Sequence, residues 1–160
     1  MMNDDGFHDD PGGNARQLDG YLQAVSALKD DGSAFICSYL GPLPPHAAFD
    51  ALCRSLEVTP DGLRLQPLEM VACSGALCTP RQWLLERLRP LSEADRTPLD
   101  ARLFDGFERE LEDVLGGKPH WHQLVLSGQR QLAEQLGAIW SVFVFGVGGH
   151  AYVLHCSWDS

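Results

Sequence analysis

The C-terminal segment WSVFVFGVGGHAYVLHCSWDS constrains the fold more than any other part of the chain. Two apolar, β-prone runs, 139–145 and 150–157, flank a glycine-rich stretch at 146–149. A connection this short cannot make a parallel crossover, so the two runs are expected to form an antiparallel hairpin. Residues 139–145 are apolar at both alternating sets of positions, which is typical of a strand that is covered on both faces. We therefore expect this hairpin to lie in the core of a sheet.

The same hairpin carries three residues that could also indicate a reactive site, His150, His155 and Cys156. Successive side chains of a strand point to opposite faces, so His155 and Cys156 are expected to point apart. His150 and Cys156 share a face, but their separation along a strand is about 20 Å. A Cys–His pair needs hydrogen-bond contact at about 3 Å. The pattern therefore favours a structural role for these residues.

Helical periodicity and turn signals predict the elements that precede the hairpin. Two segments, 79–82 and 97–100, place Thr before Pro and a Gln or Asp three residues after the Thr, which is typical of a helix start. Further helices are expected over 14–31, 49–56 and 129–136. Strands are expected over 33–41, 63–73 and 122–127. Pro67 falls within the second of these strands and indicates an edge position or a break there. Strands and helices do not alternate regularly. The order therefore predicts an α+β fold, a single domain in which an antiparallel or mixed sheet with a C-terminal β-hairpin packs against several helices.

Residues 1–13 are expected to form a disordered acidic tail. They contain four Asp and end in Pro-Gly-Gly, which interrupts helical periodicity. The α+β domain is therefore predicted over 14–160, with Asn14 as the N-cap of its first helix. The first residues lack the basic residues of a secretory signal, and no apolar run is long enough to span a bilayer as a helix. These features favour an intracellular protein.

Charge and cysteine content narrow the class of partner and the compartment. The formal net charge is −10, which repels nucleic acid and anionic membrane surfaces and attracts a basic protein. The five cysteines are odd in number and lack the regular spacing of a disulfide framework, so free thiols in a reducing cytoplasm fit best. We expect a cytoplasmic protein that binds neither nucleic acid nor membrane.

Two His and two Cys could together form a zinc site. His120 and His122 would point to one side of a strand, and Cys73 and Cys78 have the spacing of a zinc half-site. The alternative is that the two His flank Trp121 in an exposed loop. Neither half-site is specific, so no metal and no cofactor is predicted.

Cys78 is also a candidate nucleophile, because it directly precedes a predicted helix and a helix N-terminus lowers a thiol pKa. The alternative is a small residue packed under the helix start. The glycine-rich stretch 146–149 precedes no helix and is therefore read as a turn rather than a phosphate-binding loop. No catalytic residue is predicted.

One acidic helix face is the candidate partner-binding site. Asp105, Glu108 and Glu112 gather opposite an apolar stripe, and Asp113 lies off the centre of the same face. A charged face is often only solvated, but on a chain of this net charge it would also steer a basic partner.

Together these features favour a small acidic protein-binding module over an enzyme. The sharpest hypothesis is an inhibitor or immunity-type protein, antitoxin-like, that neutralises a basic partner such as a toxin. One alternative is a small enzyme or ligand-binding domain with a pocket between sheet and helices, including a version that uses a reactive Cys. Another is a structural subunit anchored by an exposed Trp83, Trp121 or Trp158.

Overall fold

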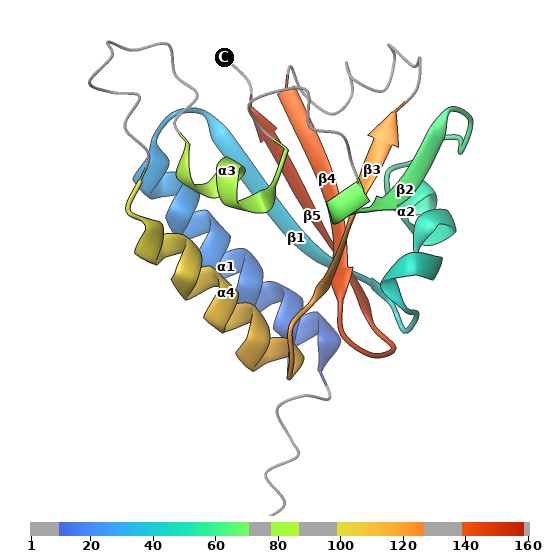
Figure 1. Ribbon diagram of the computed structural model, residues 1–160, viewed down its shortest axis with the longest axis horizontal. Helices are drawn as coiled ribbons and strands as arrows, with labels where there is room; N and C mark the ends of the chain where they lie inside the picture. The colour runs from blue at the N-terminus through green and yellow to red at the C-terminus, as the bar shows by residue number, and fades with distance from the viewer. Residues whose placement is uncertain (1–9, 71–77, 87–98, 127–138, 159–160) are drawn as a thin grey trace, which may run out of the picture.

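The computed structural model describes residues 10–70, 78–86, 99–126 and 139–158. In this part of the chain a five-stranded antiparallel sheet is packed against helices, so the predicted α+β class is confirmed (Figure 1). The strand order is β1-β5-β4-β3-β2. The strands are β1 Ser33–Gly41, β2 Leu63–Pro67, β3 His120–Leu126, β4 Ile139–Gly146 and β5 Ala151–Trp158.

The C-terminal hairpin occupies the interior of the sheet, as the sequence predicted. Strands β4 and β5 pair antiparallel with Phe143 opposite Leu154 and Val144 opposite Val153. Residues 142–145 are fully buried although they alternate between the two faces. Each face must therefore be covered, which is why this strand is apolar on both sides.

Three helices cover one face of the sheet: α1 Pro11–Lys29, α3 Pro80–Leu85 and α4 Ala101–Leu115 (Figure 1). Their apolar stripes meet the odd-numbered side chains of β1 and β4 and the even-numbered ones of β5 in one core. This core includes Leu18, Leu22, Phe35, Trp83, Phe107, Leu111, Phe143, Phe145, Leu154 and Cys156. Trp83 is fully buried, so it cannot anchor a partner.

A smaller layer covers part of the opposite face. It consists of α2 Phe49–Ser55 and the 3-10 turn Pro45–Ala47, and a second 3-10 turn, Leu68–Met70, follows β2. The core on this side contains Ala48, Leu52, Cys53, Leu63, Leu124, Val142, Val144, Ala151 and Val153. The edge position predicted for Pro67 is confirmed, because β2 ends the sheet.

Helix α1 begins three residues earlier than the sequence predicted. The Asp10 side chain accepts a hydrogen bond from the Gly13 backbone N–H at 3.0 Å, and Pro11 occupies the first helical position. Proline suits this position because its missing N–H would have no partner there. Asn14 is therefore not the N-cap but lies inside the helix, where its side chain donates to the Val114 carbonyl at 3.4 Å. Residues 1–9 of the predicted tail lie outside the described residues.

Helix α4 begins at Ala101 and is capped by Asp100, whose side chain accepts from the Arg102 backbone N–H at 3.0 Å. The cap predicted at Thr97 lies outside the described residues, as does the helix predicted over 129–136. At the start of α3 the predicted capping box is confirmed, with Thr79 accepting from Gln82 N–H and the Gln82 side chain accepting from Thr79 N–H.

Side chains of α1 cover the open edge of the sheet along β1. Asp19 accepts from the Cys37 N–H at 2.8 Å, Gln23 donates to the Phe35 carbonyl at 2.8 Å, and Ser26 donates to the Ser33 carbonyl at 2.7 Å. An edge strand with free backbone groups is a template for pairing with another chain. The polar stripe of α1 therefore satisfies groups that would otherwise invite edge-to-edge association.

A buried lysine at the end of α1 forms an ion pair with Asp31 and also contacts α3. The Lys29 and Asp31 side chains are 0% and 2% exposed, and Lys29 Nζ lies 3.5 Å from the Asp31 carboxylate. Lys29 also donates to the carbonyls of Trp83 and Glu86, at the C-terminal end of α3. A cation stabilises this end of a helix because the last carbonyls carry partial negative charge.

Candidate functional site

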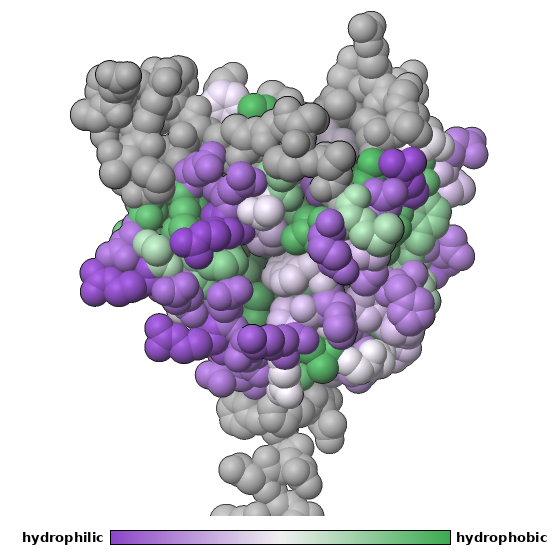
Figure 2. All heavy atoms as spheres, viewed as in Figure 1, coloured by the Kyte–Doolittle hydropathy of each residue, from purple (hydrophilic) through white to green (hydrophobic). Residues whose placement is uncertain are grey.

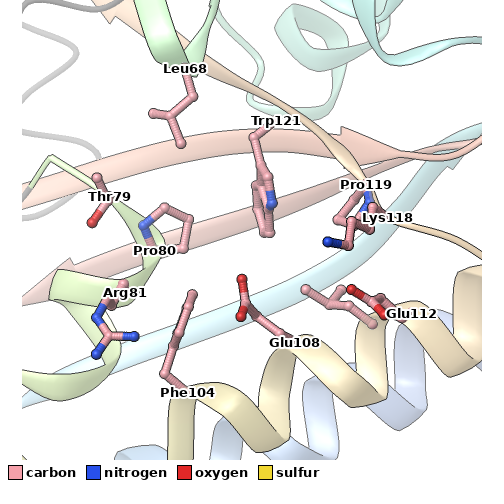
Figure 3. A pocket seen from close by; sticks show the side chains of 11 residues that line it. Leu68, Thr79, Pro80, Arg81, Phe104, Glu108, Glu112, Lys118, Pro119 and Trp121 are labelled. Carbon is pink, nitrogen blue, oxygen red and sulfur yellow. The ribbon is translucent and has the colours of Figure 1, made fainter. Parts of the chain in front are cut away.

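A pocket of about 310 Å³ opens between α3, α4 and β3. The view in Figure 3 shows Trp121 projecting from β3 toward Phe104 and Glu108, which project from α4. Leu68, Pro80, Leu111 and Pro119 complete its apolar walls. The pocket thus lies between sheet and helices, the position expected for a ligand site in an α+β domain.

Aromatic packing holds the Trp121 side chain in place. Its ring centroid lies 4.7 Å from that of Phe145, and its ring meets Phe143 edge-on at 6.2 Å. Both Phe residues belong to the buried core, so Trp121 has a rigid support. On the opposite wall the Arg81 guanidinium lies 5.2 Å from the Phe104 ring centroid. The pocket therefore offers two aromatic surfaces to a ligand.

Four exposed charged residues line the pocket, Arg81 and Lys118 with Glu108 and Glu112. The ion pairs formed within the described residues are Arg16–Asp10, Lys29–Asp31 and Arg102–Asp100. None of them includes a charged residue of the pocket. Opposite charges thus lie around one opening without neutralising one another in close pairs.

The four predicted partner-binding residues are all exposed on α4. Glu108 and Glu112 line the pocket, whereas Asp105 and Asp113 lie outside it. Figure 2 shows hydrophilic residues gathered along this part of the surface. The nearby Arg102 is paired with Asp100 at 2.6 Å, and this contact lowers the pKa of Asp100 to about 2. Arg102 is therefore engaged at the start of the helix.

The predicted orientation of the His pair is confirmed. His120 and His122 both project from β3 on the face away from α3 and α4, and both line a second pocket of about 480 Å³ with His46 and Glu69. Within the described residues, however, no group of three or more His, Cys, Asp or Glu is arranged to hold a metal ion. Cys78 precedes α3 on the opposite face, and Cys73 lies outside the described residues.

The cysteines depart in part from the sequence prediction. Cys37, Cys53 and Cys156 are free and buried, and burial raises the pKa of the Cys37 thiol to about 12. Burial also raises the pKa of Cys53 and of Cys156. Cys78 is disulfide-bonded, so the prediction of free thiols is wrong at this position. A disulfide-bonded Cys78 has no thiolate for nucleophilic attack.

His122 is expected to make the stability of the fold depend on pH. Burial lowers the pKa of this imidazole below 6.5, Glu69 acts in the opposite direction, and His46 and His120 lower the pKa further. The Nδ1 atom of His122 is buried without a hydrogen-bond partner among the described residues. The unfolded chain therefore binds a proton at His122 more readily than the folded chain. The free energy of unfolding should fall as the pH falls below about 6.5.

Urea unfolding between about pH 7.5 and pH 5.5 measures this effect, because most carboxylates stay ionised in that window. The decline in stability should be smaller in the H122Q variant than in the wild type. The comparison variant is H120Q, which keeps the partly buried His122 and removes only the smallest of the causes that lower its pKa, so its decline should stay close to that of the wild type. An identical decline in the wild type and in H122Q would contradict the prediction.

The chain matches no protein-family model, and comparisons with curated proteins and with solved structures also find no match. No helix in the described ranges is long and apolar enough to cross a membrane. The class that the structure defines is an α+β domain with a pocket between its sheet and helices and a His-lined pocket on the far face.

The sequence singled out Glu108 and Glu112 and named Trp121 as a possible partner anchor, but it did not place these residues in one pocket with Arg81 and Lys118. A signal for Trp121 was present, because alternation along β3 places it on the face opposite to His120 and His122. No comparable local signal marked Arg81, which belongs to a helix far away in the sequence.

Proposed function

We propose that this protein is a small acidic protein-binding module that uses the exposed face of α4 to bind a basic protein. In its sharpest form it is a cytoplasmic inhibitor or immunity-type protein, antitoxin-like, that neutralises a basic partner such as a toxin. The partner-binding residues in this proposal are Asp105, Glu108, Glu112 and Asp113.

One observation carries the proposal: these four acidic side chains are exposed on one helix, and none of them forms an ion pair within the described residues. Asp105, Glu108 and Glu112 follow one another at helical spacing and share one side of α4. The nearby Arg102 is occupied by Asp100. Negative charge that no close pair neutralises is available to a partner.

Electrostatics also favours the choice of partner. The net charge of −10 gives the molecule a field that accelerates encounter with a basic surface and opposes approach to phosphate backbones. A partner whose own groove binds nucleic acid would present such a basic surface. Occupation of that groove by α4 would inhibit the partner without any catalytic residue.

The test compares two variants that lose the same charge from different faces. D105N/E108Q/E112Q removes three charges from α4, and the control D30N/D50N/E69Q removes three from exposed positions elsewhere. Partners captured from a lysate of the source organism with the wild-type protein are purified, and their association rates are measured at low and high salt. We expect the α4 variant to slow association at least about tenfold at low salt and the control to have a small effect.

Two results would contradict the proposal. One is a set of captured proteins that bind the α4 variant as well as they bind the wild type. The other is an association rate that does not change between low and high salt, because electrostatic steering is screened by salt.

A second candidate function is small-ligand binding, and the pocket between α3, α4 and β3 favours it. The version of this candidate that uses a reactive Cys receives no support from Cys78, which is disulfide-bonded, or from the three buried free thiols.

A further inference from the structure

We infer that the pocket between α3, α4 and β3 binds a small zwitterion of amino-acid size, a free α-amino acid with an apolar or aromatic side chain. This inference goes beyond the binding of a basic protein. The pocket shares Glu108 and Glu112 with the exposed helix face, but it also needs Arg81 and Trp121, which the proposed function does not use. The two can therefore fail separately.

Charges of both signs are balanced around the opening of the pocket. Two cationic and two anionic side chains line the pocket, and no close ion pair within the described residues joins them. A ligand with one charge of each sign can contact both kinds of group, as an ammonium with Glu108 or Glu112 and a carboxylate with Arg81. Guanidinium groups suit the carboxylate because they can donate two parallel hydrogen bonds to it.

The arrangement of the charges agrees with such a ligand. Figure 3 shows Arg81 beside Phe104 at one end of the pocket, Glu112 with Lys118 at the other end, and Glu108 between the two ends. A ligand lying across the opening would therefore meet a cation and an anion in different places. The same balance disfavours ligands with one sign of charge, because a polyamine would meet Arg81 and Lys118, and a nucleotide would meet both Glu residues.

The interior of the pocket is apolar. Trp121 presents its ring to the pocket from a rigid support on Phe145, and Leu68 and Pro119 add apolar surface. The volume of about 310 Å³ lies at the lower end of the range for small-molecule pockets. An apolar or aromatic side chain stacked on Trp121 would fill this space and leave the charged end of the ligand at the rim.

The test uses one ligand and two analogues that each lack one charge. L-phenylalanine is the zwitterion, phenethylamine lacks the carboxylate, and 3-phenylpropionate lacks the ammonium. Binding to the full chain is followed by NMR through the indole N–H signal of Trp121, assigned with the W121F variant. We expect saturable shifts with L-phenylalanine at millimolar concentration and at least about tenfold weaker binding of each analogue, because each leaves one set of charges without a partner.

Variants locate the two charge contacts. E108Q/E112Q should weaken L-phenylalanine binding at least about tenfold, and so should R81Q. The controls are D30N and R109Q, which change exposed charges outside the pocket and should leave the affinity unchanged. All four variants change exposed residues only. Urea unfolding of each variant, compared with the wild type, shows whether it is folded.

The inference is overturned if no free α-amino acid in a full panel shifts the Trp121 signal saturably by about 20 mM, which corresponds to negligible affinity. It is also overturned if phenethylamine or 3-phenylpropionate binds as tightly as L-phenylalanine. These experiments contain no protein partner. Neither result therefore bears on the proposal that α4 binds a basic protein, which is tested separately.

Discussion

Replacement of Asp31 with Asn is expected to lower the free energy of unfolding by about 3 kcal/mol. Lys29 is completely buried, and the Asp31 carboxylate lies 3.5 Å from its ammonium group. Burial lowers the pKa of Lys29, and Asp31 acts in the opposite direction by favouring the charged ammonium. An Asn side chain keeps an oxygen that can accept from the Ser33 N–H, as Asp31 does at 2.9 Å, but it carries no charge. The D31N variant therefore leaves a buried cation without its counter-ion.

The neighbouring residue provides a matched control. Asp30 is exposed and has a left-handed backbone with φ of 45°, a conformation that Asn adopts readily. The D30N variant makes the same chemical change one residue away and should alter stability by less than about 0.5 kcal/mol. Urea unfolding at neutral pH measures both variants. Equal stabilities of D31N and D30N would show that the buried pair contributes nothing net to the fold.

The D31N substitution is also expected to change the position of α3 at the pocket. Lys29 holds the C-terminal end of α3 through the carbonyls of Trp83 and Glu86, and α3 supplies one wall of the pocket. A Lys29 ammonium that loses its counter-ion can also lose its proton, which would weaken these contacts. The buried pair thus links the stability of the domain to the position of Arg81.

Replacement of Gly146 with Ala is the second substitution with a large expected effect, a loss of about 3 kcal/mol. A Cβ atom at this position would lie 2.0 Å from the His150 carbonyl oxygen and 3.1 Å from Cγ of Pro45. The first of these atoms belongs to the backbone of the facing hairpin arm and cannot rotate away. The hairpin would therefore have to open at this point, and Pro45 would also have to shift slightly.

Gly149 is the matched control in the same turn. A Cβ atom there meets nothing within 4 Å, and its backbone is not in the left-handed region. The G149A variant is therefore expected to change stability by less than about 0.5 kcal/mol. Thermal and urea unfolding of the two variants test the comparison. If G146A is as stable as G149A, the close approach of the two backbones does not constrain residue 146.

The sequence alone determined the elements whose signals are local. The short loop between two apolar runs forced an antiparallel hairpin, and the doubly apolar β4 required cover on both faces of the sheet. Strand β1 also lies where the pattern placed it, over Ser33–Gly41. These predictions succeeded because each depends on side-chain alternation or on chain length between neighbours.

Local signals failed where two of them competed. The Pro-Gly-Gly stretch after Asp10 predicted a break, but the same proline is the first residue of α1. A proline that follows an Asp reads equally well as the start of a helix. The contacts of the folded helix favour the earlier start, because they place Asn14 in reach of the Val114 carbonyl.

Only the tertiary structure decided which polar and charged residues belong together. Arg81, Glu108 and Trp121 come from different elements and meet in one pocket, and no spacing in the chain marks that meeting. Lys29 appears in sequence as an ordinary helix-terminal lysine, yet packing of α1 against α3 buries it completely. Alternation and periodicity in the sequence indicate which side of a helix or strand faces the core. A site depends instead on distances between elements, and these distances are set only when the helices pack on the sheet.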